Sequence, residues 1–320
     1  MVAQHFGSQL HPNILQSMVD LLAVVGPTAS GKTRRAVELA RAFNGEIISG
    51  DSRQVYTGMD IGTGKDLEEY GEVAVHLVDM RPAGYRCNLH EYITEFHHAV
   101  RDIRSRGHLP ILCGGSGLYV ETALAGVQLP NVPKNEALRA QLEGKSLEEL
   151  SAILASYRNL HNTTDTDNPR RAIRAIEIEE YYATHPQQAA LADKAKAERP
   201  ASLIIGVDIP RDDRRRRIEE RLDARLRAGM VEEITRLLDS GIPASDLIYY
   251  GLEYKFVTLY ATGELSFREM REGLLTAIRQ FAKRQMTWFR GMERRGFPIH
   301  WLAYDMPSPN FTAAVASMLR

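Results

Sequence analysis

The sequence predicts an α/β fold in which a parallel sheet core is interrupted by a helical insertion. Between residues 21 and 129, short aliphatic runs alternate with amphipathic helical stretches, which is the pattern of βαβ units. Residues 133–199 are instead rich in Ala, Glu, Leu and Lys and contain no obvious strand, and a strand-like run resumes at Ser202. The chain of 320 residues is long enough for a core and a second domain.

The individual elements follow from hydrophobic periodicity. The last long helical pattern places Phe281 and Trp288 on its apolar face, so we expect both in the core. The predicted strands are Leu21–Val25, Glu46–Ser49, Val73–Val78, Leu109–Cys113 and Ser202–Ile209. The predicted helices are Lys32–Phe43, Leu89–Arg106 and two long ones over about residues 211–240 and 266–292. The resulting segments are an N-terminal extension (1–18), an α/β core (19–130 and 200–305), a helical insertion (131–199) and a C-terminal tail (306–320).

The composition is typical of a soluble globular protein. Hydrophobic residues make up 44% and charged residues 25%, which argues against disorder, collagen and coiled coil. No apolar run approaches the ~20 residues of a membrane helix, and the N-terminus lacks the basic and apolar regions of a secretory signal. The 2 cysteines cannot build a disulfide framework or a four-cysteine zinc site. We therefore expect a cytoplasmic protein without a membrane partner.

The near-zero net charge conceals an uneven distribution. There are 40 Lys and Arg against 41 Asp and Glu, for a formal net charge of −1. Basic residues nevertheless outnumber acids in Asn168–Arg174, Arg211–Arg227 and Ile278–Arg295, so the rest of the chain is acidic. Such segregation suits a polyanion held on one face, although a solvated helix face is an equally good explanation of any single cluster.

A phosphate-binding motif follows the first predicted strand. The segment Gly-Pro-Thr-Ala-Ser-Gly-Lys-Thr fits G-x-x-x-x-G-K-[ST] without a mismatch and leads into an amphipathic helix. The glycines let backbone N–H groups point at an anion beside the positive end of that helix. We expect Lys32 to neutralise a terminal phosphate and Thr33 to bind Mg²⁺. The motif predicts a P-loop, kinase-like core that binds a di- or triphosphate through Gly26, Pro27, Thr28, Ala29, Ser30, Gly31, Lys32 and Thr33.

An acid follows the second predicted strand. Groups just beyond the carboxyl ends of parallel strands line the ligand crevice, so Asp51 is expected to face the P-loop, where it can act as a base. The alternative is an aspartate that only stabilises a turn or a helix start. Asp79 and Asp208 are competing acids at strand ends, and either could be an indirect Mg²⁺ ligand.

A glycine-rich turn, Gly114–Tyr119, follows the Leu109–Cys113 strand. Its glycines permit close approach of a ligand, and Ser116 offers a hydroxyl at the same edge of the sheet. A tight strand–helix connection without a ligand is the equally weighted alternative.

In combination these motifs resemble the tRNA dimethylallyltransferases, also called tRNA isopentenyltransferases or IPP transferases. The resemblance covers most of the chain in the expected order. It implies transfer of a dimethylallyl group from dimethylallyl diphosphate to N6 of the adenosine at tRNA position 37, with release of diphosphate. The matching segments are Gly26–Thr33, Ile48–Tyr56, Gly58–Thr63, His76–Asp79, Gly114–Tyr119, Asn168–Glu177 and Arg279–Gln285.

The resemblance also implies roles for particular residues. Asp51 is the implied general base, with Thr28, Arg217 and Arg221 completing the catalytic set and the two arginines near the diphosphate. Arg214 and Arg225 depart from the family pattern, in which apolar residues are expected, and no role is assigned to Gly251–Lys255. The helical insertion is expected to contact the anticodon stem-loop, and the chain to act as a monomer. The implied tRNA contacts are Asp51, Ser52, Arg53, Gln54, Ser116, Arg139, Arg170, Arg171, Arg174, Arg279, Gln280, Lys283, Arg284 and Gln285.

Three other functions compete with tRNA prenylation. An adenylate isopentenyltransferase would use free adenine nucleotide, but the Arg170–Arg174 and Arg279–Gln285 clusters favour tRNA. A P-loop kinase would use ATP, yet no arginine-rich lid is evident between the sheet strands. An RNA-binding module that only senses nucleotide would have no use for Asp51 or the glycine turn.

Overall fold

The computed structural model describes residues 19–127, 132–157, 166–194 and 199–319. The predicted extension, residues 1–18, lies outside the described residues. The chain divides into two compact units: Met1–Ala125 with Pro200–Arg320, and Gly126–Arg199. The first unit contains the α/β core and is called unit 1 below; the second, unit 2, is helical.

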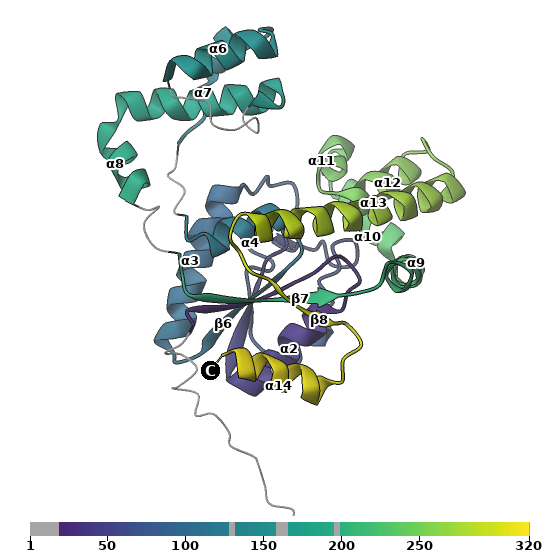
Figure 1. Ribbon diagram of the computed structural model, residues 1–320. Coiled ribbons are helices and arrows are strands. Elements are labelled where there is room, and N and C mark those ends of the chain that lie inside the picture. Colours follow the sequence, from purple (N-terminus) through teal and green to yellow (C-terminus); the bar gives the residue numbers. More distant parts are fainter. Residues whose placement is uncertain (1–18, 128–131, 158–165, 195–198, 320) are drawn as a thin grey trace, which may run out of the picture. The chain divides into compact units, whose positions relative to one another are not determined.

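A six-stranded parallel sheet forms the centre of unit 1 and confirms the predicted fold class (Figure 1). The strand order is β4-β2-β6-β1-β7-β8, and all neighbouring pairs are parallel. The central strands are apolar on both faces because helices cover both. The strands are β1 (Leu21–Val25), β2 (Gly45–Ser49), β4 (Val75–His76), β6 (Leu109–Gly114), β7 (Ser202–Asp208) and β8 (His300–Ala303). A separate pair is formed by β3 (Tyr56–Thr57) and β5 (Arg81–Pro82).

The register brings three loops to one edge of the sheet. Val25 of β1 lies opposite Gly114 of β6, and Ser49 of β2 lies opposite Cys113. The P-loop, the Asp51 segment and the glycine turn therefore leave adjacent strands at the same level, as the carboxyl ends of parallel strands should.

Helices cover the two faces of the sheet. On one face, α2 (Lys32–Phe43) packs against β1, β2 and β6, and α14 (Ser308–Met318) packs against α2. On the other, α3 (Leu89–Ser105) packs against β2 and β6 and touches α4 (Gly117–Leu124). The long helix α13 (Phe267–Arg294) begins at a capping box between Ser266 and Glu269 and packs against α4 (Figure 1).

Several elements of this unit differ from the predictions. The single helix expected over residues 211–240 is two, α9 (Arg211–Arg227) and α10 (Met230–Asp239), because Gly229 adopts φ +101° between them. The strand expected over residues 73–78 shortens to β4, since Leu77 has φ +62° and leaves the extended conformation. The edge strand β8 was not predicted. The remaining elements are η1 (Leu67–Tyr70), α11 (Ala244–Tyr249) and α12 (Leu252–Ala261).

The segment 306–320, expected to be a tail, contains α14 and belongs to the core of unit 1. Phe311 and Val315, one helical turn apart, are fully buried in the main hydrophobic cluster. The guanidinium of Arg35 lies 4.5 Å from the Phe311 ring centroid and donates to the Tyr304 carbonyl at 2.9 Å. The tail prediction was wrong because it ignored the helical spacing of these apolar residues.

Unit 2 has a small hydrophobic core of its own. Leu150, Leu154 and Ile176 are fully buried in it. Its helices are α5 (Glu136–Leu142), α6 (Leu147–Tyr157), α7 (Pro169–Thr184) and α8 (Pro186–Lys194). Across the described residues of both units, no helix is long and apolar enough to span a bilayer.

Candidate active site

The P-loop joins the end of β1 to the start of α2. Gly31, the residue before α2, adopts φ +86°, which favours glycine. Gly26 is closely packed, because a Cβ there would lie 2.8 Å from Ser30 Oγ and 3.3 Å from the Val207 carbonyl oxygen. In the described part of the chain, the buried Ser30 hydroxyl has no hydrogen-bond partner. The loop thus presents the start of a helix to an incoming anion.

A cavity of about 550 Å³ lies beside this loop. Lys32, Thr33 and Asp51 line it together, so the acid after the second strand and the P-loop face one space. Burial lowers the pKa of Lys32, and among the nearby charges Arg221 acts in the same direction while Asp51 opposes it. The cavity therefore combines a cationic end with a carboxylate.

The Asp51 carboxylate is fixed by its own turn. The Arg53 backbone N–H donates to Asp51 Oδ1 at 3.0 Å, which is the turn-stabilising arrangement expected as the alternative role. The two roles are compatible, because a carboxylate has a second oxygen. The strand end beneath it is held by the Gly50 N–H, which donates to the Cys113 carbonyl at 2.7 Å.

The glycine turn after β6 packs too closely for side chains. A Cβ on Gly114 would lie 2.3 Å from the Gly50 carbonyl oxygen, and one on Gly117 would lie 2.4 Å from the Trp288 ring. Ser116 Oγ accepts a hydrogen bond from the Ser52 N–H at 3.1 Å. The turn therefore serves as the tight connection and also anchors the Asp51 loop.

Gln285 of α13 links the P-loop to the same turn. Its Oε1 accepts from the Thr28 N–H at 2.8 Å, and its Nε2 donates to the Gly115 carbonyl at 2.9 Å. Only 6% of the residue is exposed. Within the described structure its amide is thus used to position two loops of the cavity.

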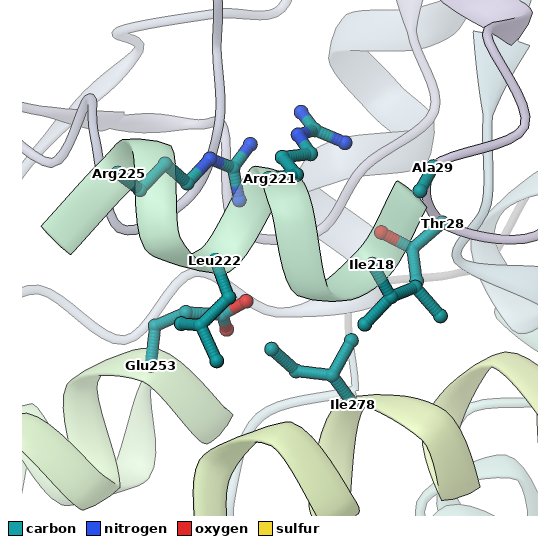
Figure 2. A pocket seen from close by; sticks show the side chains of 8 residues that line it. All are labelled: Thr28, Ala29, Ile218, Arg221, Leu222, Arg225, Glu253 and Ile278. Atoms are coloured by element: carbon teal, nitrogen blue, oxygen red, sulfur yellow. The ribbon is translucent and has the colours of Figure 1, made fainter. Parts of the chain in front are cut away.

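A second cavity, of about 1050 Å³, lies on the other side of the P-loop residues. It shares Lys32, Thr33, Arg221 and Arg225 with the first cavity, so the two meet at these four residues. Arg217 also lines it, and its Nη2 would lie 3.6 Å from a Cβ on Gly31. Figure 2 shows Arg221 and Arg225 on α9, across from Thr28 and Ala29 of the loop. The predicted arginines and the P-loop are therefore close together.

The segment 60–64 forms another wall of both cavities and is held by Glu233 of α10. The Glu233 carboxylate accepts backbone N–H groups of Asp60, Ile61 and Gly62 at 3.0, 2.7 and 3.0 Å. It also accepts the Tyr254 hydroxyl at 2.7 Å. One buried acid therefore fixes this wall.

Comparison with known proteins identifies the family. The family model described as IPP transferase matches residues 54–292, and the isopentenyl transferase model matches residues 19–79. The tRNA dimethylallyltransferase 1 of Porphyromonas gingivalis is 56% identical over 302 residues, which are 93% of this chain and 98% of that protein. The chain belongs to the IPP transferase family. The tRNA dimethylallyltransferase 2 of Bacteroides fragilis is 57% identical over 292 residues, or 90% of this chain and 94% of the relative.

Solved structures show that the IPP transferase fold extends over the chain. The tRNA isopentenylpyrophosphate transferase of Staphylococcus epidermidis is 31% identical with a TM-score of 0.66, covering 93% of this chain and 98% of that one. A eukaryotic dimethylallyltransferase acting on tRNA is 23% identical with a TM-score of 0.77, covering 93% and 77%. The family resemblance derived from the motifs is thereby confirmed.

The residues of α13 that the family resemblance linked to tRNA separate into different environments. Gln280, Lys283 and Arg284 are exposed, and Arg284 lines the first cavity. Arg279 instead donates to Glu219 of α9 at 2.8 Å. These side chains are therefore not one continuous surface.

The prediction that Phe281 and Trp288 are core residues was wrong. They are 36% and 39% exposed and line the first cavity with Arg284. The Arg284 guanidinium lies 5.9 Å from the Phe281 ring centroid, and that of Arg295 lies 5.8 Å from the Trp288 ring. The apolar stripe of α13 is wider than the core, so its edge reaches the cavity.

Of the four arginines in unit 2 that were predicted to contact tRNA, two bind a buried acid instead. Arg139 donates to both Glu177 oxygens, at 2.9 and 3.0 Å, and Arg174 donates to the same carboxylate. Burial would raise the pKa of Glu177, but these hydrogen bonds bring it to about 2. Arg170 and Arg171 are exposed, and Arg171 pairs with Asp167 at 2.8 Å. Arg139 and Arg174 therefore have a structural partner within their own unit.

The competing strand-end acids lie away from both described cavities. Asp79 pairs with the buried ammonium of Lys65, and Asp208 is exposed at the end of β7. Three residues contribute to the site although the sequence did not point to them. Arg225 and Glu253 line the first cavity, and Glu233 holds its wall. The only signals for them were departures from the family pattern at Arg225 and around Glu253, which received no role.

Proposed function

We propose that this chain transfers a dimethylallyl group from dimethylallyl diphosphate to N6 of the adenosine at tRNA position 37, releasing diphosphate. The observation that carries the proposal is the cavity in which Asp51 faces Lys32 and Thr33 of the P-loop. Membership of the family supports it, because relatives named tRNA dimethylallyltransferase match this chain over nearly their whole length.

The donor is activated by its own diphosphate, so the protein has to position it and stabilise the charge that develops as it leaves. Lys32, Arg217 and Arg221 line the P-loop end of the second cavity and supply the positive charge that stabilises the leaving diphosphate. Fixed cations act more strongly in a site that excludes water than they would in solution. Excluding water also protects a carbocation-like allylic carbon from hydrolysis.

The residues present fit a magnesium ion that is held together with the diphosphate. Mg²⁺ usually binds one or two protein ligands along with substrate phosphates and waters. The described residues contain no group of three His, Cys, Asp or Glu side chains that could hold a metal alone. Thr33 lines both cavities and its hydroxyl would hold the ion, and Mg²⁺ would neutralise charge on the departing diphosphate.

The acceptor adenine is a weak nucleophile and needs a base. Asp51 would accept the proton from N6 as the new carbon–nitrogen bond forms, and its turn holds it in position to do so. The adenine has to leave its stack to enter the cavity, which costs a few kcal/mol and least in an unpaired loop. Arg284, Phe281 and Trp288 line the same cavity and would contact the anticodon stem-loop around the displaced base.

The active form that we propose is a monomer. The test is a prenylation assay with dimethylallyl diphosphate, Mg²⁺ and an unmodified anticodon stem-loop, followed by mass spectrometry of the nucleosides. Prenylated adenosine in the stem-loop, and none when AMP is the acceptor, is the expected result. Prenylated AMP would point to an adenylate isopentenyltransferase, and phosphoryl transfer from ATP without prenylation would contradict the proposal.

The matched variants are Asp51→Asn and Asp208→Asn. Loss of a general base costs roughly 10²–10⁴ in rate, so Asp51→Asn should be at least about a hundredfold slower while binding the stem-loop normally. Asp208→Asn changes an acid at the end of β7 that lines neither cavity, and should keep wild-type activity. Equal activity of the two variants would remove Asp51 from the mechanism.

A further inference from the structure

Arg225 is a mostly buried cation with unused hydrogen-bond donors. Its side chain is 14% exposed, and among the described residues its Nε and Nη2 have no hydrogen-bond partner. Asp66 Oδ2 lies 3.6 Å from Nη2, but the same oxygen accepts a hydrogen bond from Arg221 at 2.5 Å. Buried donors of this kind are costly unless something else satisfies them.

The position of Arg225 on α9 places it in line with the two predicted arginines. Arg217, Arg221 and Arg225 are spaced by four residues, so they lie on one face of the helix. Figure 2 shows the guanidinium groups of Arg221 and Arg225 on the same side of α9. Both line the two large cavities together with Lys32. Arg225 therefore faces the space that the P-loop also faces.

The surrounding residues make room for the Arg225 guanidinium rather than neutralise it fully. A Cβ on Gly64, which has φ +64°, would lie 1.4 Å from Arg225 Nη2, so only glycine leaves that nitrogen in place. Glu253 lines the first cavity with Arg225; among the described residues it forms no ion pair or hydrogen bond with Arg225, and its charge and that of Asp66 only partly compensate the guanidinium. Burial lowers the pKa of Arg225, and Arg221 adds to that effect. An anion between the two arginines would remove their repulsion.

We propose that Arg225 binds the diphosphate of the prenyl donor alongside Lys32 and Arg221. The inference rests on the proposed function. Arg225 lines both large cavities with Lys32, so a diphosphate bound beside Lys32 would lie next to the guanidinium and its oxygens would accept hydrogen bonds from it. Because negative charge grows on the diphosphate as the carbon–oxygen bond breaks, Arg225 would stabilise the transition state as well as the bound donor.

The test compares Arg225→Met, Arg225→Lys and Arg227→Met in the full chain with wild type. Arg227 lies on the same helix but is exposed and lines neither large cavity, so it is the matched control. Calorimetric titration with inorganic diphosphate in the presence of Mg²⁺ measures the dissociation constant directly. A hydrogen bond to a charged group is worth roughly ten- to a hundredfold in affinity, and we expect that loss for Arg225→Met. Arg225→Lys should retain part of the affinity and Arg227→Met all of it.

Two further measurements separate ligand binding from a structural role. The KM for dimethylallyl diphosphate should rise in Arg225→Met while the KM for the stem-loop stays unchanged. The melting temperature without ligand should not fall, because a poorly satisfied buried charge is removed. Unchanged diphosphate affinity in Arg225→Met would overturn the proposal, with or without a lower melting temperature. If Arg225→Met loses diphosphate affinity but the wild-type chain prenylates no RNA, the proposed function fails while the anion site stands.

Discussion

Loss of the Glu233 carboxylate should disturb the site, although the residue lies behind the cavity wall. Its Oε2 accepts the N–H groups of Asp60 and Ile61, and its Oε1 accepts the Gly62 N–H and the Tyr254 hydroxyl. Glu233 is only 4% exposed, so water cannot replace these bonds readily. In Glu233→Gln one carboxylate oxygen becomes an NH₂ group. This group is itself a hydrogen-bond donor, so it cannot accept the two hydrogen bonds that the oxygen accepted.

The expected cost follows from the bonds lost. Two hydrogen bonds to a charged acceptor are worth about 1.5–3 kcal/mol each, so Glu233→Gln should lower the free energy of unfolding by about 3–6 kcal/mol. That is a large share of the ~5–15 kcal/mol that stabilises a typical domain. Since segment 60–64 lines both large cavities, any variant that still folds should also bind diphosphate more weakly.

Urea denaturation of the wild type and the variant measures the stability term, and calorimetric titration measures the binding term. Glu232→Gln is the control, because Glu232 is the exposed neighbour of Glu233 on the same helix and should change stability by no more than about 0.5 kcal/mol. A Glu233→Gln variant that unfolds within about 0.5 kcal/mol of wild type would refute the reasoning, since the four bonds would then contribute almost nothing.

Two other predictions concern single residues. Gly64→Ala should weaken diphosphate binding about as much as Arg225→Met, because the new Cβ would occupy the position of the guanidinium; titration of both variants checks this, and wild-type affinity in Gly64→Ala would contradict it. The folded-state pKa of Glu177 is about 2 against an ordinary 4.5, so its stabilising effect is present above about pH 4.5 and is lost as the pH falls towards 2. The protection factors of the α7 amides, corrected for the intrinsic exchange rate at each pH, should therefore fall over that range, whereas those of Glu177→Gln should already be low at neutral pH and show no such fall.

Local patterns were sufficient for the parts of the site that depend on neighbouring residues. The P-loop motif and helix 32–43 follow from glycine spacing and from one amphipathic stretch, and the helix is found with the predicted bounds. Short apolar runs predicted the end of β2 at Ser49 and the end of β6 to within one residue, at Cys113 where the strand ends at Gly114. Parallel pairing then places Asp51 at the same edge as the P-loop.

The other parts of the site depend on contacts between segments that are distant in the sequence, and hydrophobic periodicity does not predict such contacts. Gly64 and Arg225 are far apart in the sequence, and no local sequence pattern shows that the absence of a side chain at Gly64 leaves room for the Arg225 guanidinium. The same holds for Glu233, which appears in the sequence as an ordinary acid of an amphipathic helix. Phe281 was misplaced for a related reason, because a helical stripe does not show where the core ends and a cavity begins.

The charges around the two cavities explain how one site can remain folded without its donor and still bind a strongly anionic one. The acids Asp66, Glu69 and Glu253 lie among the cations that face the P-loop. These acids partly neutralise the arginines and so limit the repulsion among them in the absence of ligand. A site made only of cations would be strongly destabilised by that repulsion. The acids cannot satisfy the arginines' hydrogen-bond donors, however, as the free nitrogens of Arg225 show within the described structure. A diphosphate would both neutralise the arginines and accept their hydrogen bonds. The arrangement of charges therefore favours a compact polyanion over a singly charged anion.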